Sequence, residues 1–229
     1  MSESNGTKQK LLDAAERLFA MRGVDGVTVR EILAAAGQRN MAALYYHFGT
    51  KEDLIRTLVV RGARLIDERR NRMLDELETG GAAPTVRQAV EALVRPSVGL
   101  VGNGRGEATY IRFHVLLQLN HRELFLDALQ GRWNSGYQRC LGHLRTALAW
   151  LPGEVLNQRL VFVEIYLNGV IATREGVLAD RPDTRGFWSR SSLLENLIDT
   201  IVAVLEAPVG DDTTALLATA EAHRPAPAS

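Results

Sequence analysis

The stretch Thr28–Phe48, which reads TVREILAAAGQRNMAALYYHF, constrains the fold of this chain more than any other feature. Thr28 and Glu31 have the spacing of a capping box, in which each side chain satisfies a free amide at the start of a helix. Four apolar residues at i, i+3, i+4 and i+7 then give that helix one buried face: Val29, Ile32, Leu33 and Ala36. Gly37 should end the helix, because glycine redirects a chain at little cost.

A second short helix is expected from about Asn40 to His47, with Leu44 and Phe48 directed inward. Two helices joined by a short turn form a helix-turn-helix, and an α-helix fits the width of the DNA major groove. Apolar periodicity also predicts a helix over residues 8–21 and a long one from Thr50 to about residue 79, which would brace the pair. The pattern therefore predicts a DNA-binding unit.

Polar side chains at the start of the second helix are of the types that read base edges. Arg39 suits guanine, Gln38 or Asn40 suits adenine, and Met41 or Ala43 can contact a thymine methyl group. Residues at helix starts, or with free donors, are candidates for contacts with DNA phosphates: Thr28, Arg30, Tyr45, His47 and Lys51. Tyr46 is equally consistent with DNA contact and with packing, and His47 also with capping its own helix.

The charge distribution agrees with an anionic partner at one end of the chain. The formal net charge of the 229 residues is zero. Residues 1–72 contain 13 Lys and Arg against 9 Asp and Glu, whereas residues 73–229 contain 14 against 18. A basic front and an acidic back are expected of a protein that contacts nucleic acid with its N-terminal part.

Several classes of protein are disfavoured by what the sequence contains. Cys140 is the only cysteine, so no intrachain disulfide is expected and a reducing compartment is favoured. The polar N-terminus and the absence of an apolar run near ~18 residues predict a cytoplasmic protein without a membrane anchor. No cofactor, metal-ligand or nucleophile motif is present in the sequence. His143 lies three residues after Cys140 and could make a reactive thiol, but a buried structural cysteine is the more common case, so we expect no enzyme.

The chain divides into three expected parts, all of them helical where they are folded. Residues 1–50 form the helix-turn-helix domain, residues 51–207 a larger helical bundle, and residues 208–229 an Ala-, Thr- and Pro-rich tail without stable structure, although residues 212–222 could form one more marginal helix. Residues 80–84, GGAAP, read as a linker after the long connecting helix. Helices are expected further on over these ranges: 85–101, 107–119, 122–129, 134–151, 154–179 and 189–206.

The last two long helices are apolar around most of their circumference, which predicts burial on two sides. One side should face the chain's own bundle and the other a second copy, the alternative being an entirely intramolecular core. The residues expected at this interface lie on both helices: Val161, Ile165, Asn168, Gly169, Ala172, Leu194, Leu197, Ile198, Ile201, Val202 and Leu205. A dimer would place two recognition helices one turn of DNA apart, so the DNA target should be an inverted repeat.

The helices expected from about residue 85 to residue 166 mix aromatic residues with scattered polar ones. This composition is typical of ligand pockets and equally of loosely packed cores. The candidates for a pocket that binds a small hydrophobic effector are these: Tyr110, Phe113, His114, Trp133, Tyr137, Phe162 and Tyr166.

At these residues the chain resembles the TetR family of bacterial transcriptional regulators. The matching elements are Phe19 with Arg22-Gly23, the segment from Thr28 to Ile32, Ala36-Gly37, and LYYHFGTKEDL at 44–54. The resemblance covers about residues 8–60. It implies a dimer with an N-terminal DNA-binding domain and a C-terminal ligand domain, phosphate contacts by Tyr45, His47 and Lys51, and a place for Arg30 at the DNA.

One feature departs from the family pattern. Six residues separate Gly37 from Leu44, one more than is usual, so the turn or the helix start must absorb an extra residue. The expected function is a repressor released from its operator by a small molecule. A helix-turn-helix regulator that responds to a protein partner or a redox signal, or one that activates transcription, is the alternative.

Overall fold

The computed structural model describes residues 2–100, 108–180 and 185–222, and every regular element in these ranges is helical. The N-terminal elements are α1 (Ser2–Arg22), α2 (Val29–Ala35), α3 (Ala42–Phe48) and α4 (Lys51–Glu78). The elements that follow are α5 (Val86–Val94), η1 (Arg95–Ser97), α6 (Tyr110–Asn120), α7 (Arg122–Leu129), α8 (Ser135–Ala147), α9 (Gly153–Asp180), α10 (Arg185–Trp188), α11 (Ser191–Glu206) and α12 (Asp211–Ala222). The predicted all-helical fold is confirmed.

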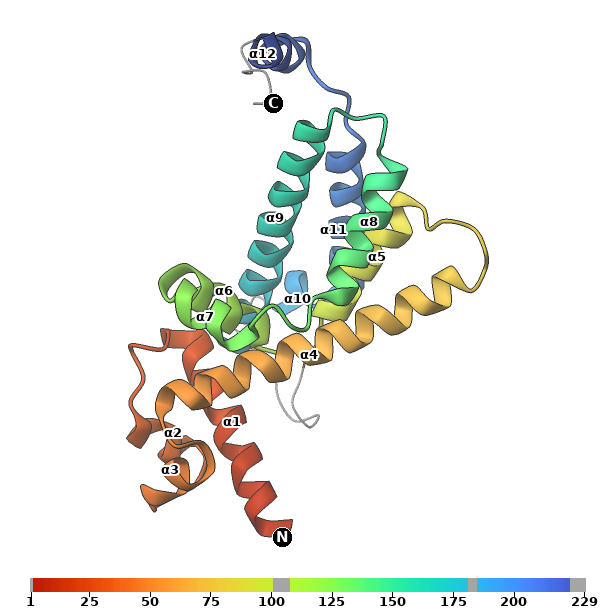
Figure 1. Ribbon diagram of the computed structural model, residues 1–229. Helices are drawn as coiled ribbons and strands as arrows, with labels where there is room; N and C mark the ends of the chain where they lie inside the picture. Colours follow the sequence, from red (N-terminus) through yellow and green to blue (C-terminus); the bar gives the residue numbers. More distant parts are fainter. Residues whose placement is uncertain (1, 101–107, 181–184, 223–229) are drawn as a thin grey trace, which may run out of the picture.

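Helices α1, α2 and α3 form a small unit at one end of the chain, and α4 leads out of it (Figure 1). Side chains from all four helices meet in one core without exposure to solvent: Leu11, Phe19, Ile32, Leu44 and Leu54. Burying side chains of this size contributes about 1.5–3 kcal/mol each. The short helices α2 and α3 would be unstable alone, so this shared core is what fixes their relative orientation.

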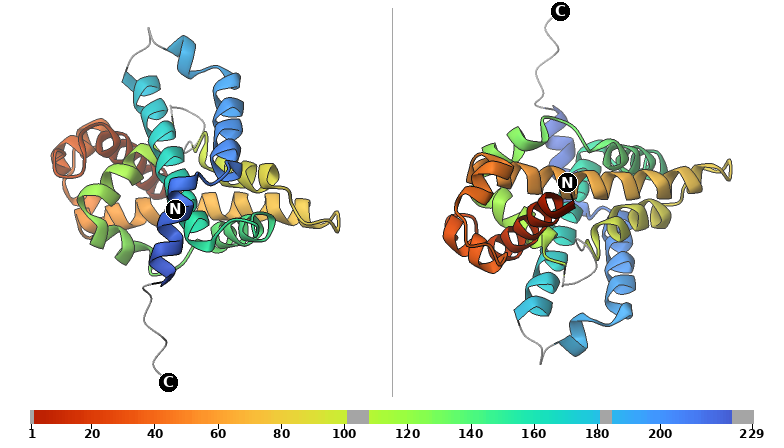
Figure 2. Two further views of the ribbon diagram at one scale, coloured as in Figure 1. Left: turned by 90° about the horizontal axis from the view of Figure 1, so that it is seen from above. Right: turned by 90° about the horizontal axis from the view of Figure 1, so that it is seen from below.

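Helix α4 connects the small unit to the rest of the molecule. Thr50 caps it by accepting a hydrogen bond from the amide of Asp53 at 3.0 Å. Seen from above and below, α4 crosses the width of the chain with the three-helix unit at one end (Figure 2). It packs on α5, α7 and α8 along the way and on α1 and α3 in the three-helix unit, so it joins the two parts directly.

The larger bundle consists of α5–α9 and α11, in which α9 packs on α6 and α11 while α5 packs on α8 and α11. The predicted bounds of α7 agree with the structure, and those of α9 and α11 differ by at most two residues at either end. The helix predicted over 85–101 ends earlier, because Pro96 lacks the amide that continues a helix and a short η1 turn follows. The short helix α10 was not predicted.

Within the tail expected over 208–229, the helix considered for residues 212–222 is present. Residues Asp211–Ala222 form α12, which begins with Asp211 and Asp212, the charge that favours a helix N-terminus. The remaining residues 223–229 lie outside the described part of the chain. Helix α12 stands apart from the bundle, at the end opposite to α1–α3 (Figure 1).

Polar contacts join the three-helix unit to the bundle. Arg61 of α4 donates to Glu16 of α1 at 2.6 Å, and Thr109 donates to the same carboxylate at 3.0 Å. Arg112 of α6 donates to the carbonyl of Ala20 at 2.7 Å. Because Glu16 is buried, loss of Arg61 would leave an uncompensated charge, and loss of Thr109 would leave a carboxylate oxygen without a hydrogen-bond partner. These contacts therefore couple the two parts in this state.

Glu175 of α9 makes stability at this junction depend on pH. Its Oε2 accepts from the amide of Arg112 at 2.8 Å, while its buried Oε1 has no hydrogen-bond partner. Burial raises the pKa of Glu175 from the ordinary 4.5 to about 8. The folded state therefore holds this proton more tightly than the unfolded state does, and the resulting stability is complete below about pH 4.5 and lost as the pH rises through 8.

We expect the free energy of unfolding of the native chain to fall with pH relative to that of Glu175→Gln, by at most roughly 1.4 kcal/mol per pH unit between these limits. Urea denaturation at a series of pH values measures the difference. Glu154→Gln, an exposed change on the same helix, should run parallel to the native chain. If the free energy of unfolding of Glu175→Gln varied with pH in parallel with that of the native chain, Glu175 would be ionised in the folded state at neutral pH.

Candidate nucleic-acid interface

The start of α2 is built as the sequence predicted, but its polar groups are used within the chain. Thr28 Oγ1 accepts from the amide of Glu31 at 3.3 Å, and Glu31 Oε2 accepts from the amide and the hydroxyl of Thr28 at 2.8 and 2.7 Å. Arg22 also donates to Glu31 at 2.8 Å, and these hydrogen bonds lower the pKa of Glu31 to about 2. A carboxylate at this position repels phosphate, so the geometry does not support the expected contact by Thr28.

The turn between α2 and α3 absorbs the extra residue. Six residues, 36–41, separate the two helices, and Gly37 adopts a φ of +68°, a conformation that glycine accepts at no steric cost. Asn40 Oδ1 accepts from the amide of Ala42 at 2.9 Å and so caps α3. The second helix therefore begins at Ala42 rather than near Asn40, and Gln38, Arg39, Asn40 and Met41 lie in the turn.

These positions change what each turn residue can contact. The amide oxygen of Asn40 is occupied by its capping bond, which weakens the case for a contact with adenine. Gln38 is half-buried, whereas Arg39 and Met41 are exposed. Arg39 forms no hydrogen bond or ion pair with the described residues, so its guanidinium is free to bind a base or a phosphate.

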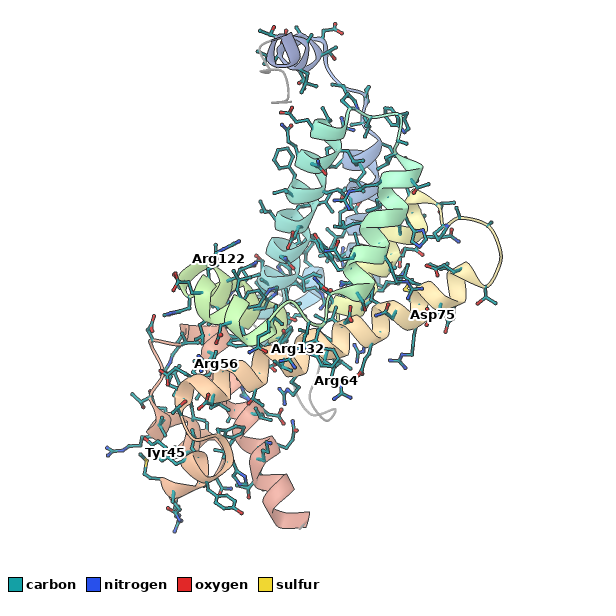
Figure 3. The ribbon with its side chains drawn as sticks, viewed as in Figure 1. Tyr45, Arg56, Arg64, Asp75, Arg122 and Arg132 are labelled. Carbon is teal, nitrogen blue, oxygen red and sulfur yellow. The ribbon has the colours of Figure 1, made fainter. Side chains whose placement is uncertain are left out.

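Helix α3 has one buried and one exposed face. Leu44 is fully buried, and Ala43 is half-buried with one side packed against the core. Its predicted contact with a thymine methyl group stays a prediction. Tyr45 and Tyr46 are 53% and 81% exposed, too open for a packing role. Tyr45 projects at the end of the molecule formed by α1–α3 (Figure 3). His47 is half-buried, with its ring 5.1 Å from that of Tyr46.

Lys51 does not stand free at the start of α4. Its Nζ donates to the carbonyl of Val24 at 2.6 Å and lies 5.7 Å from the ring centre of Phe19. The cation thus ties α4 to the loop after α1. Sequence periodicity could not reveal this contact, because the two residues are far apart in the chain.

Two further basic residues lie at this end of the molecule and were missed from the sequence. They are Lys8 and Lys10, for which the sequence predicted only a place in the first helix. Lys10 is exposed, and Lys8 Nζ lies 5.7 Å from the ring centre of Phe48 at the end of α3. Arg30 is exposed as well, and its contact with DNA stays a prediction. We define the recognition surface as five exposed aromatic, basic or long apolar side chains of the turn, α2 and α3: Arg30, Arg39, Met41, Tyr45 and Tyr46.

Comparison with known proteins identifies the family. Residues 11–58, the three-helix unit and the start of α4, match the family model described as bacterial regulatory proteins, tetR family. The chain is 32% identical over 203 residues to the HTH-type transcriptional repressor AcnR of Corynebacterium efficiens, which covers 84% of this chain and 92% of the relative. The chain belongs to the TetR family. It is therefore a helix-turn-helix transcriptional regulator that binds DNA, and not an enzyme.

Other members agree in sequence or in fold. The HTH-type transcriptional repressor KstR2 of Rhodococcus jostii is 31% identical over 153 residues, 59% of this chain and 69% of that protein. The crystal structure of Mycobacterium smegmatis AmtR superposes with a TM-score of 0.55 over 94% of each chain, at 21% identity. The latter likeness concerns the fold alone.

The bundle of this TetR family member contains a cavity of about 290 Å³. Four of the seven predicted pocket residues line it: Tyr110, His114, Trp133 and Tyr137. Phe113 does not, because its ring is buried against Phe19 of α1 with centroids 6.0 Å apart. Phe162 and Tyr166 do not either, since both are exposed on the outer face of α9.

The residues predicted at a dimer interface divide into exposed and buried sets. Val161 and Ile165 are 53% and 66% exposed, and Gly169 is exposed beside them. Asn168 lines the cavity instead, while Leu194 and Val202 are half-buried. The remaining residues are buried in the chain's own core, and their assignment to an interface is wrong: Ala172, Leu197, Ile198, Ile201 and Leu205.

Helix α9 has an unusually apolar exposed face. Val161, Phe162, Ile165 and Tyr166 form a continuous stripe on it, with Phe162 57% exposed. By length and composition α9 is the one described helix able to cross a membrane, although the core helix of a soluble protein passes the same test.

Proposed function

We propose that this TetR family member is a cytoplasmic repressor that binds an inverted-repeat operator as a homodimer and leaves it when a small molecule enters the cavity. The observation that carries the proposal is the recognition surface. Its aromatic and basic side chains are exposed on a rigid three-helix unit and make no use of their polar groups within the described chain. The relatives AcnR and KstR2, both named as repressors, support the direction of regulation.

In this proposal α3 enters the major groove with its exposed face toward the bases. Arg39, at the leading end, donates to a guanine, and Met41 contacts the groove floor. Tyr45, Tyr46 and Arg30 contact phosphates or sugars on either side and fix the orientation of the helix. Lys51 keeps its bond to Val24 and can still donate a second hydrogen bond to a phosphate, because an ammonium group has three donors.

Dimerisation through α9 is supported by the exposed apolar stripe. Exposed patches of this kind on soluble chains mark interaction sites. A second copy of the same stripe is the partner of choice, since a two-fold interface joins one surface to itself. The two recognition surfaces would then lie about 34–36 Å apart on one face of the duplex.

Coupling between cavity and DNA is supported by the shared helices. The cavity is lined by Ala63, Ile66 and Arg70 of α4, and α4 also carries Leu54 of the DNA-binding core. A ligand that prefers a bundle with α4 displaced must weaken DNA binding by that same preference. A coupling free energy of about 1–3 kcal/mol would change operator affinity roughly 5- to 150-fold.

The assignment of Arg39 can be tested by substitution. Arg39→Ala should cost about 1–3 kcal/mol at one base pair and remove the preference there, leaving other positions of the operator unaffected. Fluorescence anisotropy with duplexes altered one base pair at a time measures this. Arg122→Ala on α7 removes the same charge far from α3 (Figure 3) and should leave binding unchanged. Equal weakening on all duplexes would instead place Arg39 on a phosphate.

A thiol-based redox switch is not favoured. Cys140 is fully buried, and burial raises the pKa of its thiol to about 11, which suppresses the reactive thiolate. His143, its neighbour in sequence, is held by Glu78 at 2.8 Å. Between a redox signal at Cys140 and a small molecule in the cavity, the small molecule is therefore the better supported.

A further inference from the structure

The cavity in the bundle holds hydrogen-bond donors without partners, and these indicate what kind of molecule it accepts. Most of its wall is apolar, including Ile66, Ile111, Leu141 and Val163. An apolar wall with a few polar groups is the usual composition of a small-molecule site, in which the polar groups determine specificity. The chemistry of those groups is therefore the most informative property of the site.

Arg70 of α4 is the first of these groups, and it is 8% exposed. Its Nε donates to the carbonyl of Ala92 and its Nη2 to that of Leu93, both at 3.1 Å. Neither contact is with a carboxylate, and Nη1 has no hydrogen-bond partner among the described residues. Asp67, one turn away, instead accepts from the amide of Gly136 at 2.8 Å and the hydroxyl of Ser135 at 2.9 Å.

A buried cation without a carboxylate partner is energetically costly. Three features explain why an arginine is tolerated here: the two carbonyls at the end of α5, the Tyr137 ring 5.9 Å from the guanidinium, and the negative charge of Asp67 nearby. None of them is a direct ion pair. Burial lowers the pKa of Arg70, in keeping with that cost, although a guanidinium remains protonated. An anionic group entering the cavity would supply the direct ion pair that Arg70 does not form with Asp67.

Trp133, in the loop between α7 and α8, is the second group. Its φ of +61° lies in the left-handed region, which is a genuine outlier for so bulky a residue and occurs mainly where the surroundings enforce it. The guanidinium of Arg64 lies 5.7 Å from the centre of its ring. The buried Nε1 of Trp133 has no hydrogen-bond partner, and an indole nitrogen can only donate.

His114 completes the wall as a neutral ring. It stacks with Tyr110 at 6.1 Å and Phe125 at 4.7 Å between centroids, and burial lowers its pKa to about 4. Its Nδ1 has no partner. Glu164 also lines the cavity and accepts from the hydroxyl of Tyr137 at 3.1 Å, while the ring of Tyr137 lies 5.9 Å from the guanidinium of Arg70. The Glu164 carboxylate repels negative charge placed near it, so it favours a ligand with a single carboxylate held at Arg70.

On the basis of the effector function inferred above, we propose that the cavity binds a small hydrophobic monocarboxylic acid. The carboxylate pairs with Arg70, which supplies the charge and the free Nη1 donor. Trp133 donates from Nε1 to an oxygen of the ligand. The apolar body packs against the wall formed by Tyr110, His114 and Phe125.

Isothermal titration calorimetry of the full chain with three acids and their uncharged amides tests the proposal. The acids are 4-phenylbutyrate, 3-(indol-3-yl)propionate and octanoate. Each amide has the shape of its acid without the charge. At least one acid should bind about 10- to 100-fold more tightly than its amide, as expected for a charge-assisted hydrogen bond in a buried site. If no acid binds more tightly than its amide, the proposal is wrong.

Variants assign the preference to residues. Arg70→Met should abolish the difference between acid and amide, whereas Arg72→Met, an exposed change on the same helix, should preserve it. Should Arg70→Met fail to fold, Trp133→Phe keeps an aromatic side chain but removes the pyrrole ring with its Nε1 donor, and it should weaken acid binding about 3- to 10-fold. Native acid preference in either folded variant would contradict the role given to that residue.

Operator binding without ligand separates this proposal from the proposed function. A chain that binds operator DNA but prefers no acid overturns the acid site alone. A chain that prefers the acids but binds no DNA overturns the repressor function and leaves the acid site standing.

Discussion

Replacing Phe162 and Ile165 together by glutamate is expected to give a folded monomer that has lost most of its operator affinity. Both side chains are more than half exposed on α9 in the single chain, so the charges are solvated in the monomer and buried only in a dimer. A monomer presents one recognition surface and loses the gain from binding two linked half-sites, which is roughly 100-fold or more. Sedimentation velocity and anisotropy titration measure the two effects.

Leu119→Glu provides the matched control for this experiment. Leu119 is equally apolar and exposed, but lies on α6 and outside the α9 stripe. It should remain dimeric and bind DNA normally. A double variant on α9 that stayed dimeric at micromolar concentration would show that the interface lies elsewhere.

Gly62→Ala is expected to destabilise the chain by about 1–3 kcal/mol, although alanine is ordinarily the better helix former. Gly62 lies in the middle of α4, where the ring of Tyr110 crosses it so closely that a Cβ would overlap the ring carbons. The hydroxyl of Tyr110 is anchored on the carbonyl of Val59 at 2.9 Å, and the ring is fully enclosed, so it cannot move aside. Thermal or urea denaturation measures the loss.

Gly142→Ala is the control, since a Cβ at this exposed position in α8 would meet nothing within 4 Å. It should stabilise the chain by about 0.5–1 kcal/mol. If Gly62→Ala stabilised the chain as well, α4 and α6 would have to be farther apart than the structure places them. Because Tyr110 also lines the cavity, the Gly62 variant should in addition alter ligand binding.

Local features of the helix-turn-helix unit could be predicted from the sequence because they depend on neighbours in the chain. The capping box of Thr28 and Glu31, the turn at Gly37 and the burial of Leu44 follow from spacing and periodicity. The extra residue before Leu44 could also be seen in the sequence, but not whether the turn or the start of the second helix accommodates it. Only the structure shows that the turn takes it and that Asn40 caps α3.

Features that depend on distant contacts could not be predicted. Periodicity revealed that α9 and α11 are apolar on most sides, but not that Leu197 and Ile201 face the chain's own core while Ile165 faces outward. The same holds for Lys51, whose partner Val24 lies in another loop. Arg70 is one of several arginines on α4, and nothing in the sequence distinguishes it as the buried one beside the cavity.

Selection of bound duplexes from a random DNA pool, followed by measurement of the number of chains on each selected duplex, tests the central claim most directly. Paired recognition surfaces predict an enriched inverted repeat, with half-site centres about 10–10.5 base pairs or a multiple of that apart and at least two chains bound. Enrichment of a single half-site occupied by one chain, or no enrichment at all, would contradict it.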